Sequence, residues 1–520
     1  QRRVHGGMEK LVSAIFLLVL VNSGVHGYDL KLLEPLCKKL PYPGPCKYFL
    51  SQDSSYDPIK LSTNFLLVSL ELALRKAEDA LSVAYYVGSK IRNKREKTAW
   101  NDCIQLYENA IDQLNATISS KSSKIDKQTW ISTALTNLQT CRTGFRELGV
   151  ADYVYPLMAN NVSYLLSNTL SLNKVHFRRP RHKLGFPAWV RQGDRKLLQS
   201  NSPSISANAV VASDGSGQFR TISQAVSAAA KRSSKSRFVI YVKAGVYKEN
   251  VNVPKGASNI MLIGDGIGKT IITGSKSVGG GSTTFNSATL GVVGNGFMAR
   301  GITVRNTAGP QRHQAVALRS GSDLSVFYKC SFEGYQDTLY VLSQRQFYKN
   351  CDIYGTVDFI FGNAAVVLQS CNIYARFPPN SINTITAQGR TDPNQNTGIS
   401  IHQCRVTAAP ELRPHLANVR TFLGRPWKAY SRTVYMNCFL DSLINPAGWY
   451  PWSGNFALNT LFYGEYANNG PGSSTNKRVK WKGYRAILSP AVASQFTVQN
   501  FIAGNTWLPR TGVPFVAGLV

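Results

Sequence analysis

The first part of the chain has the apolar periodicity of amphipathic helices. Stretches such as 61–87 and 99–114 carry apolar residues at spacings of three and four, with few internal Gly or Pro. Helices of this kind bury their apolar faces best by packing against one another in antiparallel fashion. The pattern therefore predicts an all-α helical bundle over residues 28–175.

The pattern changes to short strands after about residue 205. Segments rich in Val, Ile, Phe and Tyr alternate with Gly, Asn and Pro, which is typical of strands and turns. A cysteine, any residue and an apolar residue recur at spacings of 21, 20, 33 and 34 residues, at Cys330, Cys351, Cys371, Cys404 and Cys438. A period near twenty with occasional insertions indicates a solenoid. We therefore expect an all-β, right-handed parallel β-helix over residues 205–520.

Two aspartates share the register of this repeat. Asp337 lies seven residues after Cys330, and Asp358 lies seven residues after Cys351. Since coils stack about 4.8 Å apart, the two carboxylates are predicted to be neighbours. Solvent-facing loop aspartates are the alternative, but both lie in apolar, aromatic segments, where an unpaired carboxylate is costly. Two close carboxyl groups rarely both lose their protons, so one tends to stay protonated while the other is an anion. Such a pair offers a nucleophile and a general acid, although the pattern does not say which aspartate has which role.

The charge of the chain points to an anionic partner. It has 59 Lys and Arg against 28 Asp and Glu, a formal net charge of +31. An acidic polysaccharide fits better than nucleic acid, because the basic residues are spread along the chain and form no finger or basic-helix motif. A basic surface without a specific ligand remains the alternative.

The N-terminal segment has the features of a secretory leader. Residues 1–7 precede Met8 and are interpreted as upstream or non-native residues. Residues 8–27 combine a charged start with about eleven apolar residues, which matches a signal peptide and is too short to span a bilayer. We therefore expect a secreted, extracellular protein without a membrane span. Two sequons, at Asn115 and Asn161, agree with secretion but are weak signals.

Secretion permits disulfides among the nine cysteines. Cys37 and Cys46 close a Pro-rich loop, and Cys103 with Cys141 would tie two helices, although spacing alone does not fix the pairing. The five cysteines of the second half leave at least one thiol free unless it pairs between chains. A column of stacked cysteines could also serve as small apolar core residues.

A basic, polar segment separates the two halves. Residues 176–204 form the expected linker, and the tetrad Arg-Lys-Leu-Leu from Arg195 to Leu198 is a candidate site for a processing protease. An ordinary solvated linker explains the charge nearly as well.

Five ordered motifs of the second half resemble plant pectin methylesterases. They are Gly-Val-Tyr-Lys-Glu at 245–249, Gln-Ala-Val-Ala-Leu at 314–318, Gln-Asp-Thr-Leu at 336–339, Asp-Phe-Ile-Phe-Gly at 358–362 and Leu-Gly-Arg-Pro-Trp at 423–427. The resemblance covers about residues 205–515. The first half is similar to the invertase/pectin methylesterase inhibitor-like pro-region found ahead of many such enzymes. The resemblance implies hydrolysis of methyl esters of cell-wall pectin (homogalacturonan) with release of methanol, and an autoinhibitory first half.

The resemblance also assigns catalytic roles. It implies that Asp358 is the nucleophile and that Asp337 protonates the departing methanol and later activates water. Gln336 and Gln314 have amide donors suited to an oxyanion hole. Without the resemblance, a glutamine that buttresses a turn would be the simpler interpretation.

Three further residues complete the expected site. Arg425 is suited to hold Asp358, because a guanidinium binds a carboxylate through two parallel hydrogen bonds. Trp427 offers an aromatic face for a sugar ring, and the family pattern places Thr284 in the substrate groove with Gln314 and Arg425. By itself Trp427 would be taken for a core residue.

Other features are interpreted as structural or as absent functions. Gly245 is expected to turn the coil, and Glu249 to pair with a neighbouring Arg. The seven His form no ligand cluster, so no metal or cofactor is expected. A monomer is expected, with its own pro-region or separate inhibitor proteins as protein partners. Rival functions are a lyase or polygalacturonase, which would need an acidic calcium cluster or a Gly-His-Gly, and a catalytically silent inhibitor protein.

Overall fold

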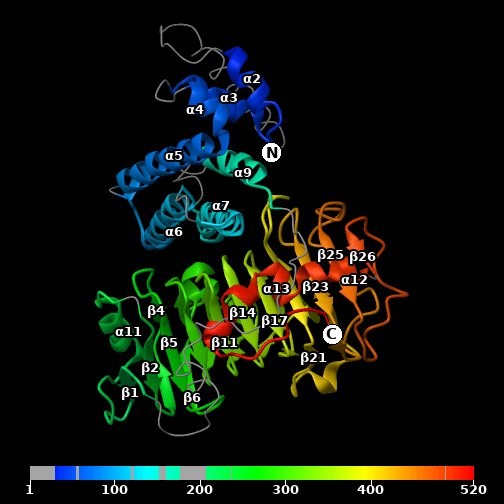
Figure 1. Cartoon of the computed structure of the whole chain (residues 1–520). Helices are drawn as coiled ribbons and strands as arrows, with labels where there is room; N and C mark the ends of the chain where they lie inside the picture. Colours follow the sequence, from blue (N-terminus) through cyan, green and yellow to red (C-terminus); the bar gives the residue numbers. More distant parts are fainter. Residues whose placement is uncertain are drawn as a thin grey trace.

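The computed structural model describes residues 30–53, 58–88, 90–118, 122–150, 160–175, 206–234, 236–486 and 488–519. The expected signal peptide, the upstream residues 1–7 and the linker 176–204 with its processing site lie outside these ranges. Figure 1 shows a helical domain resting on the side of a long stack of strands.

The first part of the chain is helical, as the periodicity predicts. Helices α5, α6, α7 and α9 pack on one another, and the expected helix over 61–87 is broken at Asn64 into α4 and α5. The capping box between Ser123 and Asp126 starts α7. The helices are α2 (Leu30–Cys37), α3 (Pro43–Ser51), α4 (Pro58–Thr63), α5 (Phe65–Gly88), α6 (Lys94–Ile118), α7 (Lys124–Glu147) and α9 (Val162–Leu172).

Two disulfides hold this domain together. Cys37 pairs with Cys46, which joins α2 to α3, and Cys103 pairs with Cys141, which joins α6 to α7. Both candidate pairs from the sequence are thus confirmed.

The second part is a parallel β-helix whose coils visit three sheets in turn. The first sheet contains β1 (Ala209–Val211), β2 (Phe238–Val242), β5 (Ile260–Gly264), β8 (Met298–Arg300), β11 (Ser325–Tyr328), β14 (Arg345–Lys349), β17 (Ala365–Gln369), β20 (Gly398–His402), β23 (Arg432–Met436), β25 (Phe462–Tyr466) and β26 (Tyr484–Arg485). The second contains β3 (Gly245–Lys248), β6 (Thr270–Gly274), β9 (Thr303–Asn306), β12 (Ser331–Glu333), β15 (Asp352–Gly355), β18 (Asn372–Ala375), β21 (Arg405–Ala408) and β24 (Phe439–Leu440). The third contains β4 (Val251–Val253), β7 (Leu290–Val292), β10 (Leu318–Ser320), β13 (Leu339–Val341), β16 (Val357–Gly362), β19 (Ile382–Gln388) and β22 (Arg420–Gly424).

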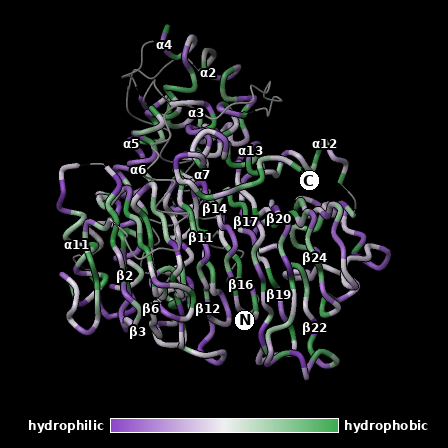
Figure 2. Tube along the Cα trace, turned by 60° about the horizontal axis from the view of Figure 1, so that its bottom comes forward, coloured by the Kyte–Doolittle hydropathy of each residue, from purple (hydrophilic) through white to green (hydrophobic). Residues whose placement is uncertain are grey.

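Short helices close the β-helix. Helix α11 (Ile222–Ala230) packs against β1, β2 and β4 at the N-terminal end of the β-helix. Helices α12 (Pro490–Ala493) and α13 (Val498–Phe501) belong to a C-terminal segment that covers the outer face of the first sheet. Figure 2 shows hydrophobic positions recurring from coil to coil between hydrophilic loops.

The interior is apolar and repeats from coil to coil. Phe327 stacks on Tyr348 at a centroid distance of 4.7 Å. The five repeat cysteines are all buried with free thiols, and the N–H of Cys371 donates to Sγ of Cys404 at 3.3 Å. These cysteines serve as small core residues, one of the two interpretations that the sequence left open.

One structural expectation was wrong. Among the described residues Glu249 pairs with no arginine: its carboxylate accepts the backbone N–H groups of Ile222 and Ser223 at 2.8 and 2.9 Å. It therefore satisfies free donors at the start of α11, where a negative charge is also favoured by the helix dipole. Gly245, with φ of 151°, adopts a backbone conformation that suits glycine at the turn before Val246.

Among the helices of the described ranges, none has both the length and the apolar character required to cross a membrane.

Candidate active site

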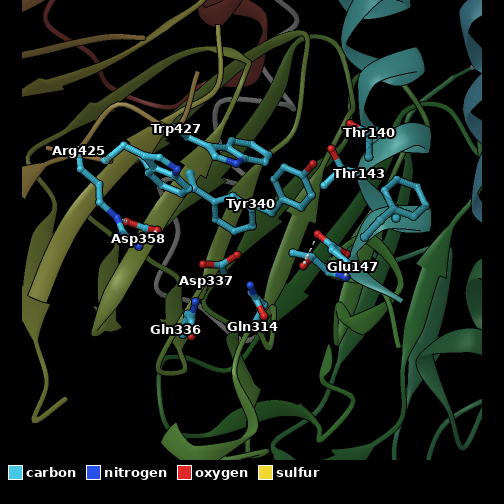
Figure 3. A pocket seen from close by; sticks show the side chains of 16 residues that line it. Thr140, Thr143, Glu147, Gln314, Gln336, Asp337, Tyr340, Asp358, Arg425 and Trp427 are labelled. Atoms are coloured by element: carbon cyan, nitrogen blue, oxygen red, sulfur yellow. Dashed lines mark hydrogen bonds and ion pairs between the residues drawn. The ribbon is translucent and has the colours of Figure 1, made fainter. Parts of the chain in front are cut away.

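Asp337 and Asp358 lie one coil apart on the third sheet. Leu339 pairs with Ile360 and Tyr340 with Phe361, which carries the 21-residue register of the repeat into the structure. The N–H of Asp337 also donates to the carbonyl of the residue before Asp358, at 3.1 Å. Both side chains face one cavity (Figure 3), and the two residues as a whole are 7% and 5% exposed.

The two aspartates share an unusual backbone conformation. Their φ angles are 62° for Asp337 and 53° for Asp358, in the left-handed region that non-glycine residues rarely adopt. Next to Asp358 the pairing of β16 with β19 shifts by one residue between Val357 and Ile360. Such local irregularities re-aim side chains at functional sites.

Two neighbours form hydrogen bonds with the carboxyl group of Asp358. Nε and Nη2 of Arg425 donate to its two carboxylate oxygens at 2.8 and 2.7 Å, which confirms the fork geometry expected from the sequence. Oγ1 of Thr384 donates to Oδ1 of Asp358 at 2.6 Å and accepts its backbone N–H at 3.0 Å. Thr384 was missed, since it lies in another coil and in no motif.

Asp337 has the opposite electrostatic environment. Burial raises its pKa well above the ordinary range, and the negative charges of Asp358 and Glu147 raise it further, while Arg425 opposes the shift. This environment therefore favours the protonated form of Asp337. The two aspartates, one coil apart, thus have different surroundings: Asp358 faces a guanidinium fork, and Asp337 is buried beside negative charges.

The two glutamines flank the acid. Gln336 precedes Asp337 in the chain, and the N–H of Ala315 donates to the Gln336 carbonyl at 3.2 Å, which brings Gln314 to the adjacent coil. Both side chains line the cavity and lie beside Asp337 in Figure 3. Amide N–H donors are therefore available where negative charge would develop in an ester reaction.

Aromatic rings form one wall of the cavity, whose volume is about 310 Å³. Tyr340 stacks on Phe361 at 4.2 Å, and Phe361 meets Trp427 edge-on at 5.9 Å. The Arg425 guanidinium lies 4.4 Å from the centre of the Trp452 ring. Trp452 was missed because it follows the last strand of the third sheet in a segment without strand periodicity.

Trp427 has room because residue 389 is a glycine. A Cβ atom at Gly389 would lie 2.8 Å from Cε3 of the Trp427 ring. Trp427 is half-buried at the cavity rather than in the core, as the family resemblance suggested.

The helical domain closes the remaining side of the cavity. Thr140, Thr143, Gly144 and Glu147 of α7 are among its lining residues. Glu147 accepts the backbone N–H and the hydroxyl of Thr284, both at 2.9 Å. The expected substrate residue Thr284 is therefore bonded to the pro-region. No motif of the sequence pointed to Glu147.

In the described part of the chain, no group of three or more His, Cys, Asp or Glu side chains is arranged to hold a metal ion.

A β-helix groove with two adjacent aspartates, an arginine fork and amide donors, covered by a helical domain, fits a carboxylic ester hydrolase fused to its own inhibitor-like domain. Comparisons with known proteins agree. The Pectinesterase family model matches residues 208–505, and the model for the plant invertase/pectin methylesterase inhibitor family matches residues 31–172. The chain belongs to the pectinesterase family, as an enzyme of the pectin methylesterase type with an N-terminal inhibitor domain.

Relatives share both domains. Pectinesterase 2 of Citrus sinensis is 64% identical over 98% of this chain and 99% of its own, and the probable pectinesterase/pectinesterase inhibitor 17 of Arabidopsis thaliana is 60% identical with the same coverage.

Solved structures match the β-helix. The pectin methylesterase from carrot is 60% identical with a TM-score of 0.60, and it covers 61% of this chain and 100% of its own. The Aspergillus niger enzyme is 33% identical with a TM-score of 0.50, covering 59% and 96%. The carrot chain is matched over its full length by 61% of this chain, so that protein has the β-helix fold without a helical domain of this kind.

Proposed function

We propose that the chain hydrolyses the C6 methyl esters of homogalacturonan in pectin, with Asp358 as the nucleophile and Asp337 as the general acid and base. The observation that carries this assignment is the fork from Arg425 to Asp358 beside a buried, proton-holding Asp337. A carboxylate that is already paired and ionised attacks more readily than a protonated one.

In the first half of the reaction, an oxygen of Asp358 forms a bond to the ester carbonyl carbon. The negative charge that develops on the carbonyl oxygen is stabilised by the amides of Gln314 and Gln336. The bond to the methoxy group then breaks, and Asp337 transfers its proton to that oxygen, so methanol leaves. The product is an acyl-enzyme in which the substrate is joined to Asp358.

In the second half, Asp337 is a carboxylate and takes a proton from water. The resulting hydroxide adds to the acyl carbon, and the bond to Asp358 breaks. This returns Asp358 as a carboxylate and Asp337 as an acid. The second product is the free carboxylic acid of the galacturonate unit, which loses its proton to the solvent and becomes a carboxylate.

The groove residues support a sugar polymer as substrate. Trp427, Phe361 and Tyr340 offer flat apolar faces for sugar rings. Thr284, Gln314 and Arg425 provide polar groups at the cavity. Together they account for a substrate that combines apolar ring faces with hydroxyl and carboxyl groups.

The helical domain acts as an autoinhibitory pro-region. It occupies one side of the cavity with α7, and Glu147 uses the hydrogen-bonding groups of Thr284. A polymer is therefore excluded while α7 stays in place.

The deciding experiment is methanol release from methylated pectin by the fragment 199–520. We expect activity in this fragment, loss of at least about 10⁴-fold in Asp358→Ala, and little change in the control Asp352→Ala, an aspartate of β15 in the second sheet. Absence of methanol from the wild-type fragment, or full activity in Asp358→Ala, would refute the assignment. The full-length chain should be less active than the fragment; equal activity would refute autoinhibition.

Processing and destination are also part of the proposal. We expect secretion to the cell wall, cleavage between Arg195 and Leu198, and a monomeric enzyme. N-terminal sequencing of wall-extracted protein tests the first two expectations, and a mature terminus far from residue 199 would contradict them. Light scattering tests the third.

A further inference from the structure

The active cavity is continued along the third sheet by residues of one register. Strand pairing joins Arg319 of β10 to Tyr340 of β13 on one side and to Gly291 of β7 on the other. Tyr340 in turn pairs with Phe361 of β16, the strand that carries Asp358. Arg319 thus lies two coils from Asp358, roughly 9.6 Å along the stack, on the path that a polymer in the groove would follow.

Arg319 is a buried cation with unused hydrogen-bonding capacity. Its side chain is 5% exposed, and its guanidinium lies 3.6 Å from the centre of the Phe285 ring. Within the described residues, Nε and Nη1 have no hydrogen-bond partner. A buried donor without an acceptor is costly, so two donors of this guanidinium remain available to a ligand.

The surroundings leave room for the guanidinium. A Cβ atom at Gly291 would lie 2.8 Å from Nη2 of Arg319. The adjoining cavity, of about 360 Å³, is lined by Arg319, Lys255 and Phe285 from the β-helix and by α6 residues such as Leu106 from the pro-region. Arg319 is therefore covered by the helical domain.

A carboxyl group already occupies the space beside Arg319. Asp102 of α6 accepts a hydrogen bond from Oγ1 of Thr283, and its charge interacts with the Arg319 guanidinium. When the pro-region leaves, Asp102 leaves with it. The space between Thr283 and Arg319 then opens to the groove with a hydroxyl donor on one side and a cation on the other.

We propose that Arg319 and Thr283 bind the free carboxylate of a galacturonate unit that has already lost its methyl ester, two coils from the nucleophile. This inference rests on the proposed function, because it takes the product of that reaction as its ligand. A carboxylate gains two charge-assisted hydrogen bonds from a guanidinium, whereas a methyl ester has no negative charge to offer. The site makes the enzyme bind a partly de-esterified chain in preference to a fully esterified one.

The test is calorimetric binding of a fully de-esterified oligogalacturonide to the fragment 199–520. We expect Arg319→Gln to raise the Kd about tenfold or more, with kcat on a short, fully methylated oligomer unchanged within about twofold. The control is Arg405→Gln, since Arg405 also stacks on a phenylalanine, Phe439 at 4.2 Å, but on the second sheet. An unchanged Kd in Arg319→Gln, or an equal rise in Arg405→Gln, overturns the site.

Two measurements protect this test from a folding defect. Arg319→Lys keeps the charge and should bind the oligomer with an affinity between those of the wild type and Arg319→Gln. A crystal structure of the wild-type fragment with the de-esterified oligomer should place a carboxylate within hydrogen-bonding distance of the Arg319 guanidinium, and an oligomer bound without that contact overturns the proposal. Failure of the proposed function would instead appear as absence of methanol release from the wild-type fragment.

Discussion

The interior of the β-helix and the surface on which α7 rests are both buried, yet polar side chains have a much larger part in the second. The interior is built from Val, Ile, Leu, Phe and Cys that repeat from coil to coil. The contact with the helical domain has an apolar part around Phe285, Tyr340 and Phe361, but α7 adds hydroxyls and amides to it. Nδ2 of Asn363 donates to Thr136 at 2.8 Å, and Nε2 of Gln139 donates to Thr391 at 2.6 Å.

This difference separates a permanent contact from a reversible one. Apolar side chains stabilise the fold only while they are kept out of water. A coil of the β-helix is therefore not stable when its interior side chains are exposed to solvent. Thr136 and Gln139 lose a protein partner on release but gain water, and the net cost of each such exchange is small. The polar contacts of the pro-region are therefore ones that both domains can lose without unfolding.

The largest expected effect is on the apolar side of this comparison. Ile353→Ala removes a fully buried side chain of β15 and should lower the free energy of unfolding of the fragment 199–520 by about 2–5 kcal/mol. Denaturant titration measures it. The control Val246→Ala changes a half-exposed residue of β3 and should have little effect. Equal losses in both variants would mean that the interior is not the source of stability.

The second prediction concerns pH and the pro-region. Burial raises the pKa of Asp102 to about 7 when the domain is docked, while Thr283, Arg319 and Lys276 lower it and Glu147 raises it. The ordinary value is 3.8, so docking is strongest below about pH 4 and weakens as the pH rises to about 7, by at most about tenfold per pH unit.

The activity of the full-length chain relative to the fragment 199–520 should accordingly increase over this interval. Asp102→Asn, which does not titrate, should flatten the profile, whereas the control Asp79→Asn, on an exposed face of α5, should not. A ratio independent of pH in the wild type would contradict the prediction.

The third prediction separates catalysis from docking. Arg425→Lys keeps the charge beside Asp358 but loses the two-pronged hydrogen bond, and kcat of the fragment should fall about 100-fold. Steady-state kinetics measure it. The full-length chain should lose activity by the same factor, since the contact lies within the β-helix. A much larger loss in the full-length chain would show that Arg425 also controls docking.

The smallest effect is expected from a single polar contact of the interface. Thr136→Val leaves the amide of Asn363 without its acceptor and should weaken docking by about 1 kcal/mol, roughly fivefold. Residual activity of the full-length chain reports it. Thr133→Val is the matched control, because Thr133 bonds to its own helix at the Thr129 carbonyl. If the residual activity of Thr136→Val is no higher than that of Thr133→Val, the hydrogen bond between Thr136 and Asn363 does not contribute to docking.

Much of the fold followed from periodicity alone. The cysteine repeat gave the coil length, and with it the neighbourhood of Asp337 and Asp358, because a β-helix converts sequence period directly into spatial register. The same logic could not find Thr384 or Trp452. Insertions change the coil length between Asp358 and these residues, so their position in the coil cannot be predicted from the repeat period.

The contacts between domains were outside the reach of sequence reasoning for a different reason. Glu147 is the last residue of an amphipathic helix. From the sequence alone it would be taken for an ordinary solvent-exposed charge, because its contact with the groove depends on how the two domains pack. Glu249 was assigned the wrong partner for a similar reason. A carboxylate in a basic chain suggests an arginine partner, whereas the composition of a chain does not reveal backbone N–H groups that are free at the start of a helix.

The column of buried thiols provides built-in probes for the unfolding of the β-helix. Cys330, Cys351, Cys371, Cys404 and Cys438 stand on successive coils, and all are closed to solvent. A thiol reagent would label each one only when its coil opens. The order of labelling, read by mass spectrometry, would therefore show from which end the stack comes apart and whether its coils open singly or together.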